Sequence, residues 1–284
     1  MKRRWTICLL ALLLLLPIRF AAAEPLQRTL PDRYLTDCPV HGEVRSLLFA
    51  GDRELLVWIP YDYDLRTKYD VVLLMHGDGD DISGWLRVPH AISGGRTTGR
   101  NILDWLAYEQ VYSPFLVVTI DNNVTTYGKH ILEDLPQALA FVAGTFSTYA
   151  REGTPEAVVE ARDHFTVGGL SRGSIYAYDF LVKEPQYAAN YLCLSSGGSR
   201  EALEAALQNA DYGLEKYFVG VGVTDGTFYW ASKRTYERVA PYARQPQLVE
   251  YAYAHNWSTW LNGLYDGLRF LLPREEAVEP VTGP

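Results

Sequence analysis

The sequence predicts an α/β fold with a mostly parallel central sheet, helices on both faces and an antiparallel hairpin at the N-terminal edge of the sheet. Two observations lead to this prediction: apolar runs of strand length alternate with segments of helix length, and two strand-like runs come first, around a short turn. Continuous Val- and Leu-rich runs separated by helices are typical of parallel strands that are buried on both faces. Because no repeat, low-complexity tract or linker interrupts the pattern, we expect a single domain over residues 24–272.

The expected elements follow one another in a regular order. Residues 43–49 and 54–59 flank the turn Ala50-Gly51-Asp52-Arg53 and form the hairpin. The later strands are expected at residues 71–75, 115–120, 165–167, 191–194, 217–223 and 248–254. The helices are expected at residues 100–109, 131–148, 172–183, 201–208, 229–239 and 257–271.

The two ends of the chain differ from this pattern. Lys2, Arg3 and Arg4 precede an apolar run over residues 7–16, and small residues lead to Ala23, which is the layout of a secretory signal peptide. The run is too short to span a bilayer. We therefore expect residues 1–23 to be cleaved near Ala23 and the protein to be secreted, either extracellular or periplasmic, without a membrane anchor. Residues 273–284 are rich in Pro and Glu and are expected to be disordered.

Charge and cysteine content narrow the choice of partners. The formal net charge is −8, and the leader carries basic but no acidic residues, so the mature chain becomes more acidic. Such a chain is ill suited to nucleic acid or to an anionic membrane surface.

Cys38 and Cys193 remain after cleavage, and export would permit a disulfide between them. Cys193 lies in an apolar run, however, where cysteine is usually a small buried residue.

A candidate nucleophile lies in Gly169-Leu170-Ser171-Arg172-Gly173, the only G-x-S-x-G in the chain. A strand-like run precedes it and a helix-like segment follows it. In a nucleophile elbow the serine occupies a sharp strand-to-helix turn with its hydroxyl exposed, and the two glycines avoid collisions. The context therefore predicts Ser171 as a nucleophile.

The acid and the base of a triad follow the serine in α/β hydrolases. His255 is the only histidine after Ser171, and it comes after an alternating run that predicts a late strand. Asp225 follows the apolar run 217–223 and is the favoured acid, while Asp211, in a loop before that run, remains the competitor. Catalytic loops gather at the carboxyl edge of an open parallel sheet, where all three exits are expected.

The loop His76-Gly77-Asp78-Gly79-Asp80-Asp81 follows the first long central strand. Acyl transfer needs two fixed N–H donors for the tetrahedral oxyanion, and here these are expected to be the backbone amides of Asp78 and Arg172. His76 is interpreted as structural. The acidic cluster lacks the remaining ligands of a known calcium loop, so a solvated loop is favoured and no metal site is predicted.

These motifs resemble the esterase D-like group of α/β hydrolases, and within it the feruloyl and acetylxylan esterases that cut side-chain esters from plant cell-wall polysaccharide. The resemblance spans about residues 71–272. It depends on Leu73-Leu74-Met75-His76-Gly77 followed by Trp85, on Gly94-Gly95-Arg96 before a helix with Asn101 and Leu106, on Glu133-Asp134-Leu135-Pro136, on Gly169-Leu170-Ser171-Arg172-Gly173, on Val223-Thr224-Asp225, and on His255-Asn256-Trp257 with Trp260. It implies the α/β-hydrolase fold, a triad of Ser171, Asp225 and His255, and the two oxyanion amides named above.

The chain departs from the family pattern near the serine. Arg172 stands where methionine is common, Ser174 where a further small residue is frequent, and Tyr253-Ala254 where a glycine pair often precedes the histidine. Arg172 either favours a carboxylate-bearing substrate or, as the simpler alternative, pairs with a loop aspartate such as Asp80.

The expected activity is a secreted serine esterase that removes feruloyl or acetyl groups from plant polysaccharide through an acyl-enzyme, without a cofactor. An acyltransferase of the mycolyl-transferring type and a general carbohydrate esterase remain as alternatives. Trp85, Trp257 and Trp260 are candidates for stacking on a phenolic or sugar ring, and Asn122 and Asn123 for hydrogen bonding to a sugar. The acyl group, the polysaccharide and the oligomeric state cannot be deduced from the sequence.

Overall fold

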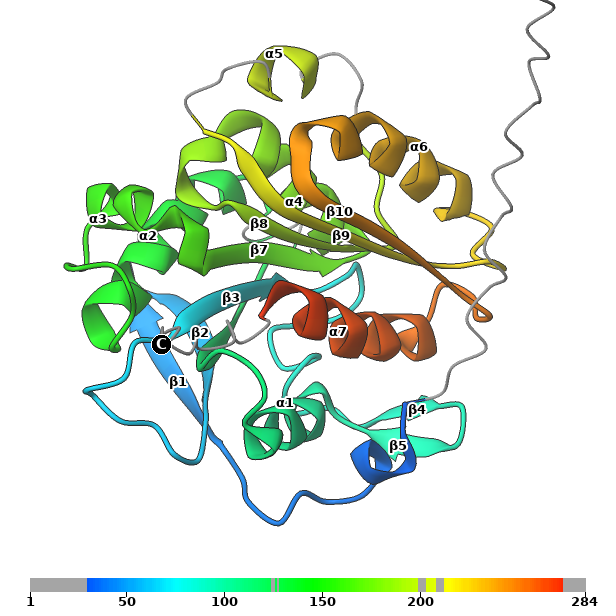
Figure 1. Cartoon of the computed structure of the whole chain (residues 1–284), viewed down its shortest axis with the longest axis horizontal. Helices are drawn as coiled ribbons and strands as arrows, with labels where there is room; N and C mark the ends of the chain where they lie inside the picture. Colours follow the sequence, from blue (N-terminus) through cyan, green and yellow to red (C-terminus); the bar gives the residue numbers. More distant parts are fainter. Residues whose placement is uncertain (1–29, 124–125, 127, 199–202, 208–211, 273–284) are drawn as a thin grey trace, which may run out of the picture.

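The computed structural model describes residues 30–123, 126, 128–198, 203–207 and 212–272. The predicted signal peptide, the predicted disordered tail and Asp211 lie outside the described residues. Within them, one eight-stranded sheet has the order β1-β2-β6-β3-β7-β8-β9-β10 (Figure 1). Its strands are β1 (Glu43–Phe49), β2 (Arg53–Ile59), β3 (Asp70–Met75), β6 (Phe115–Ile120), β7 (Phe165–Leu170), β8 (Asn190–Leu194), β9 (Leu214–Gly222) and β10 (Ala243–Tyr251).

The strand directions confirm the predicted fold class. β1 pairs antiparallel with β2, and β2 pairs antiparallel with β6, whereas each later neighbouring pair, from β6–β3 to β9–β10, is parallel. Parallel strands leave the sheet at one common edge, so the segments after β3, β7, β9 and β10 meet there. A two-stranded ribbon, β4 (His90–Ile92) and β5 (Gly95–Thr97), lies apart from this sheet.

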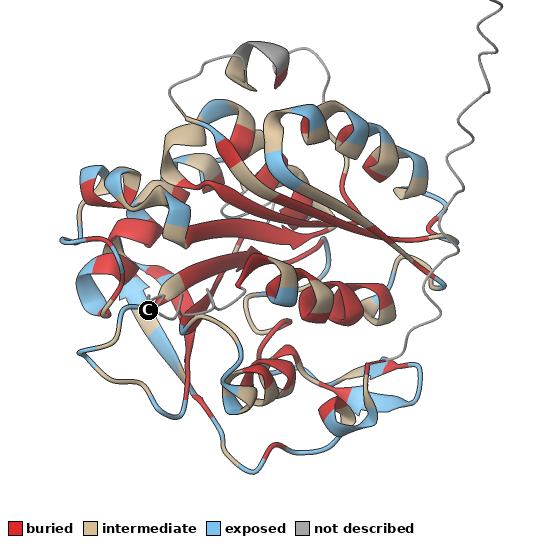
Figure 2. Cartoon of the chain, in the orientation of Figure 1, coloured by how far each residue is buried: buried red, intermediate tan, exposed pale blue. Residues whose placement is uncertain are grey.

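Helices cover both faces of the sheet (Figure 1). They are α1 (Gly99–Glu109), α2 (Ile131–Thr145), α3 (Pro155–Glu160), α4 (Arg172–Lys183), α5 (Leu203–Leu207), α6 (Tyr229–Val239) and α7 (Trp257–Leu271). Side chains of α1 and α7 belong to one apolar core, and side chains of α2, α3, α4 and α6 belong to the other. The central strands between the two cores are buried almost throughout (Figure 2), as their continuous apolar runs predict.

The element boundaries differ from the prediction at several places. β7 runs to Leu170 because Gly168 and Gly169 let it pack closely against Leu192 and Met75. The helix expected to reach residue 148 ends at Thr145, where Phe146 turns to extended backbone. The prediction missed α3, a helix of only six residues that Thr154 caps and Pro155 begins, and the three-residue strands β4 and β5. Such short elements carry no readable hydrophobic period.

Cys38 and Cys193 are both buried and unbonded, so the disulfide that export would permit does not form. Among the described residues, no helix has the length and hydropathy needed to cross a membrane. Nor do the described residues contain a cluster of three or more side chains suited to hold a metal ion.

Candidate active site

Ser171 occupies a strained turn between β7 and α4. Its backbone has φ 50° and ψ −117°, a conformation that side-chain-bearing residues rarely adopt, and its amide donates to Leu194 O at 2.8 Å. The flanking glycines are required by close contact: a Cβ on Gly169 would lie 2.6 Å from Met75 O, and one on Gly173 would lie 2.5 Å from the same oxygen. The sequence thus folds into the predicted elbow, which holds the serine side chain at the carboxyl edge of the sheet.

The exits of β9 and β10 deliver the other two groups. His255 follows β10 in the loop before α7, where Asn256 caps the helix by accepting from the Thr259 amide at 3.3 Å and Thr259 Oγ1 donates to Ala254 O at 2.6 Å. Asp225 lies three residues beyond β9, and its amide donates to Gly222 O at 3.0 Å. Both loops are therefore fixed by local hydrogen bonds.

Ser171, His255 and Asp225 form a continuous hydrogen-bonded chain. Ser171 Oγ lies 3.0 Å from His255 Nε2, and His255 Nδ1 lies 2.7 Å from Asp225 Oδ2. A carboxylate only accepts hydrogen bonds, so Nδ1 carries the proton and Nε2 is left to accept from the serine hydroxyl. The arrangement can remove a proton from the hydroxyl as it attacks an electrophile.

Burial and packing hold this chain in place. The Asp225 side chain is fully buried, and its second oxygen accepts from the amides of Thr227 at 3.2 Å and Phe228 at 2.9 Å. The His255 ring stacks on Phe228 with centroids 5.0 Å apart and meets Trp260 edge-on, also at 5.0 Å. These contacts fix the imidazole orientation that the two hydrogen bonds need.

The two predicted oxyanion donors belong to segments that adjoin the serine: Arg172 directly follows it, and Asp78 follows Gly77, on which an added methyl group would lie 3.3 Å from Ser171 Cβ. Arg172 N is the first amide of α4, and Asp78 N lies in the loop after β3; neither donates a hydrogen bond within the described part of the chain. Their side chains pair with each other, with Arg172 Nη2 and Asp78 Oδ2 3.2 Å apart. Of the two alternatives for Arg172, the structure shows the pairing with a loop aspartate, but the partner is Asp78 and not the Asp80 named as the example.

The remaining acidic groups of the loop have separate environments. Asp81 accepts from the Ser83 amide at 2.7 Å and from the Ser83 hydroxyl at 2.5 Å, which lowers its pKa. Burial raises the pKa of Asp80. His76 is structural, as predicted: its backbone amide and carbonyl bond to the Asn122 side chain at 2.8 and 2.9 Å. Asn122 is buried and committed to that bond, so the suggested contact of Asn122 with a sugar is wrong.

The three tryptophans proposed for substrate stacking serve different roles. Trp85 is 1 % exposed and donates to Met75 O at 3.1 Å, while Trp260 is 7 % exposed and donates to Ser195 Oγ at 3.1 Å. Burial therefore argues against a stacking role for these two, which support the site from within. Trp257 is partly exposed, and His90 stacks on it with centroids 3.5 Å apart.

Sequence reasoning missed His90 and Phe228, which lie in the aromatic surroundings of the triad. His90 belongs to the three-residue strand β4, which gives no periodic signal, and Phe228 comes directly before α6. The one usable signal for Phe228 was its position three residues after Asp225, in the same exit loop of β9.

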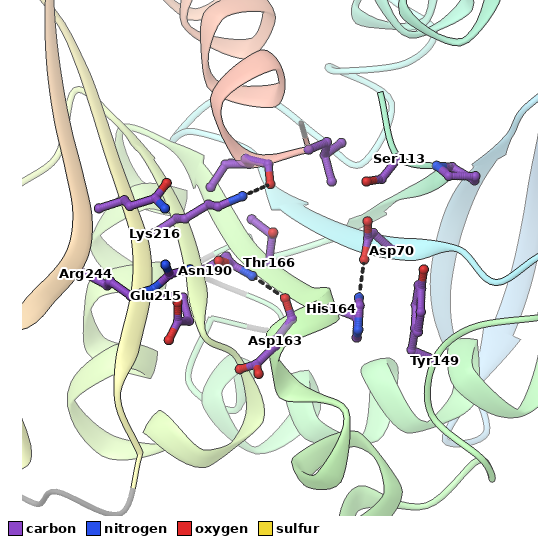
Figure 3. Close-up of a pocket in the computed structure, with 14 residues that line it drawn as sticks. Asp70, Ser113, Tyr149, Asp163, His164, Thr166, Asn190, Glu215, Lys216 and Arg244 are labelled. Atoms are coloured by element: carbon purple, nitrogen blue, oxygen red, sulfur yellow. Dashed lines mark hydrogen bonds and ion pairs between the residues drawn. The ribbon is translucent and has the colours of Figure 1, made fainter. Parts of the chain in front are cut away.

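A separate polar cavity of about 870 Å³ lies at the opposite side of the sheet from the triad, at the amino ends of the parallel strands (Figure 3). We call this side the amino edge. Its lining includes His164, Asp70, Asn190 and Lys216, and none of the predicted site residues. These groups are already engaged: His164 Nδ1 lies 2.7 Å from Asp70 Oδ1, Asn190 donates to Asp163 O at 2.7 Å, and Lys216 donates to Leu271 O at 2.9 Å. These polar groups are therefore satisfied by one another or by backbone carbonyl oxygens.

No family model matches the chain. The chain is 28 % identical over 205 residues to endo-1,4-beta-xylanase Y from Acetivibrio thermocellus, a match that covers 68 % of this chain but only 18 % of that protein. The chain therefore spans about a fifth of the relative's length.

Among solved structures, the feruloyl esterase module from Clostridium thermocellum complexed with sinapinate superposes with a TM-score of 0.72 at 22 % identity, covering 86 % of this chain and 93 % of the module. A CE1 ferulic acid esterase from Anaeromyces mucronatus gives 0.67 at 15 % identity, covering 84 % and 95 %. S-formylglutathione hydrolase from Staphylococcus aureus gives 0.62 at 15 % identity, covering 84 % and 99 %. Together with the mostly parallel sheet and its N-terminal hairpin, these likenesses show that the chain has the α/β-hydrolase fold.

Proposed function

We propose that this chain is a serine carboxylic ester hydrolase that removes feruloyl groups, or acetyl groups, from plant cell-wall polysaccharide through an acyl-enzyme. The observation that carries the proposal is the hydrogen-bonded chain from Ser171 through His255 to the buried Asp225 at a strained turn. The proposed oxyanion donors are the amides of Arg172 and Asp78, which donate to no other group among the described residues.

In the proposed reaction Ser171 Oγ attacks the ester carbonyl carbon while His255 Nε2 takes the hydroxyl proton. The carbon–oxygen bond to the alcohol then breaks, and His255 returns the proton to the departing oxygen. A water molecule attacks the acyl-enzyme with the same proton transfers in reverse order, releasing the acid and the free serine. Asp225 holds the Nδ1 proton and stabilises the imidazolium that forms in each step.

The substrate class is supported by likeness to other proteins and by composition. The similar structures include feruloyl esterases, one of them with bound sinapinate, and the curated relative is a xylanase. The acidic chain and the secretory layout of residues 1–23 fit an enzyme that works outside the cell on a neutral or esterified polysaccharide.

The test is hydrolysis of methyl ferulate, acetylated xylan and short nitrophenyl esters by the wild type and by Ser171→Ala. We expect the variant to lose at least about 10³-fold in kcat/KM while keeping the wild-type melting temperature. A fluorophosphonate probe should label the wild type and leave the variant unlabelled. Near-normal activity of Ser171→Ala would remove the serine from its role, and product analysis with an added alcohol separates hydrolysis from acyl transfer.

A further inference from the structure

The loop after β3 places near the proposed nucleophile a carboxylate that has no partner among the described residues. We propose that Asp80 is a specificity-determining residue that accepts a hydrogen bond from a hydroxyl group of the substrate, either the phenol of the acyl group or a hydroxyl of the esterified sugar. The proposal deepens the proposed function and rests on it.

Asp80 lies close both to Ser171 and to Trp257, on which His90 stacks. A methyl group placed on Gly77 would be 3.8 Å from Asp80 Oδ2 and 3.3 Å from Ser171 Cβ, so that oxygen is at most 7.1 Å (3.8 plus 3.3 Å) from Ser171 Cβ. A methyl group placed on Gly84 would be 3.7 Å from Asp80 Cβ and 3.6 Å from Trp257 Cζ2. The side chain thus stands within the reach of a group attached to an ester bound at Ser171.

The other aspartates of the loop are already engaged, whereas Asp80 is not. Asp78 pairs with Arg172, and Asp81 is bonded to Ser83. The Asp80 amide donates to Gly77 O at 3.3 Å, which fixes the turn, but its carboxylate makes no hydrogen bond or ion pair within the described residues. The half-buried Asp80 carboxylate can therefore accept a hydrogen bond from a ligand.

The charged and titratable groups that face Asp80 form no ion pair with it among the described residues. They are His76, His90 and Asp81. His90 Nε2 donates to Gly84 O at 2.7 Å, and burial lowers the pKa of His90, so that ring stays neutral near pH 7. His76 Nδ1 donates to Gly77 O at 2.8 Å and His76 Nε2 accepts from the Asn122 amide at 3.2 Å, so both of its ring nitrogens are engaged elsewhere.

The chemistry of such a group favours a hydroxyl over an anion. A partly buried carboxylate repels a carboxylate-bearing ligand and accepts a strong, charge-assisted hydrogen bond from an O–H donor. Arg172, which directly follows the serine, already pairs with Asp78 instead of being left for a uronate. The loop is thus built for neutral, hydroxylated esters.

The experiment compares Asp80→Ala and Asp80→Asn with the matched control Asp81→Asn, whose carboxylate belongs to the adjacent turn. One arm pairs methyl ferulate with methyl 3,4-dimethoxycinnamate, which differ only at the phenol. The other pairs a feruloyl arabinoside with methyl ferulate, which differ at the sugar. We expect Asp80→Ala to lower kcat/KM about tenfold on the hydroxyl-bearing member of one arm, through KM, and to leave its partner ester within about twofold. Asp80→Asn should show a smaller loss, and the responding arm identifies which hydroxyl is recognised.

A second measurement guards against a folding effect. In the Ser171→Ala background, which cannot turn over, the binding constant for methyl ferulate or the arabinoside should weaken with Asp80→Ala by the factor found in KM. Equal losses on all esters, or the same loss with Asp81→Asn, would overturn the proposal. If the wild type hydrolyses none of the esters, the proposed function fails and this inference fails with it; if the wild type is active and the substrate ratios do not move, only this inference fails.

Discussion

Two histidine–aspartate pairs lie at opposite edges of the same sheet and differ in one group. His255 Nδ1 and Asp225 Oδ2 are 2.7 Å apart at the carboxyl edge, and His164 Nδ1 and Asp70 Oδ1 are 2.7 Å apart at the amino edge. Each ring also stacks on an aromatic neighbour, Phe228 in the first case and Tyr149 in the second. Only at the carboxyl edge does a serine hydroxyl meet the second ring nitrogen among the described residues.

The difference follows from the direction of the strands. His164 comes directly before β7 and Ser171 directly after it, so one strand separates the amino-edge pair from the nucleophile. The strained turn forms where β7 meets α4, and the exits of β9 and β10 bring Asp225 and His255 to it. Both edges thus hold an oriented imidazole. The serine hydroxyl, which lets the imidazole act as the base of a triad, is supplied by the elbow at the carboxyl edge.

The comparison is tested most strongly by Asp225→Asn against its counterpart Asp70→Asn. An amide at position 225 donates as well as accepts, so it no longer fixes the proton on His255 Nδ1, and we expect kcat on methyl ferulate to fall about 10³- to 10⁴-fold. Asp70→Asn removes the equivalent partner of His164 and should leave kcat within about twofold. Equal effects of the two substitutions would show that the distinction between the edges is false.

A smaller effect is expected from Arg172→Met, which keeps the oxyanion amide and removes the ion pair with Asp78. The two side chains are 41 % and 58 % exposed, and pairs of this kind contribute little stability. We expect kcat/KM to fall only a few-fold, and by the same factor on neutral and on carboxylate-bearing esters, because Asp78 already occupies the guanidinium. A selective loss on the acidic esters would instead support recognition of a uronate by Arg172.

Much of this carboxyl edge could be predicted from residue order, for reasons that are local. The elbow is encoded by two glycines at positions where Met75 O excludes any side chain. Helices α4, α6 and α7 begin at the predicted residues Arg172, Tyr229 and Trp257. The choice of Asp225 depended on its place after an apolar run, which the structure resolves as the exit of β9.

What could not be predicted depends on contacts between distant segments. Indole rings give the same sequence signal whether they are buried, as Trp85 is, or partly exposed, as Trp257 is. Pairing of Arg172 with Asp78 rather than Asp80 is decided by how the loop after β3 turns over α4. The pair at the amino edge was invisible for the same reason, because 94 residues separate Asp70 from His164.

A third stacked histidine, His90 on Trp257, allows a test of the carboxyl edge by pH. Burial is the main cause that lowers the pKa of His90 below the 6.5 of an exposed histidine. Because the folded state holds this ring neutral, its contribution to stability is complete above pH 6.5 and is lost as the pH falls from 6.5 through the lower folded pKa. His90→Gln lacks this loss but can still donate to Gly84 O. We therefore expect its melting temperature to fall less than that of the wild type between pH 7.5 and pH 5, as measured by circular dichroism. Parallel curves of melting temperature against pH would mean that protonation of His90 does not destabilise the fold, and that the ring still stacks on Trp257 when it is charged.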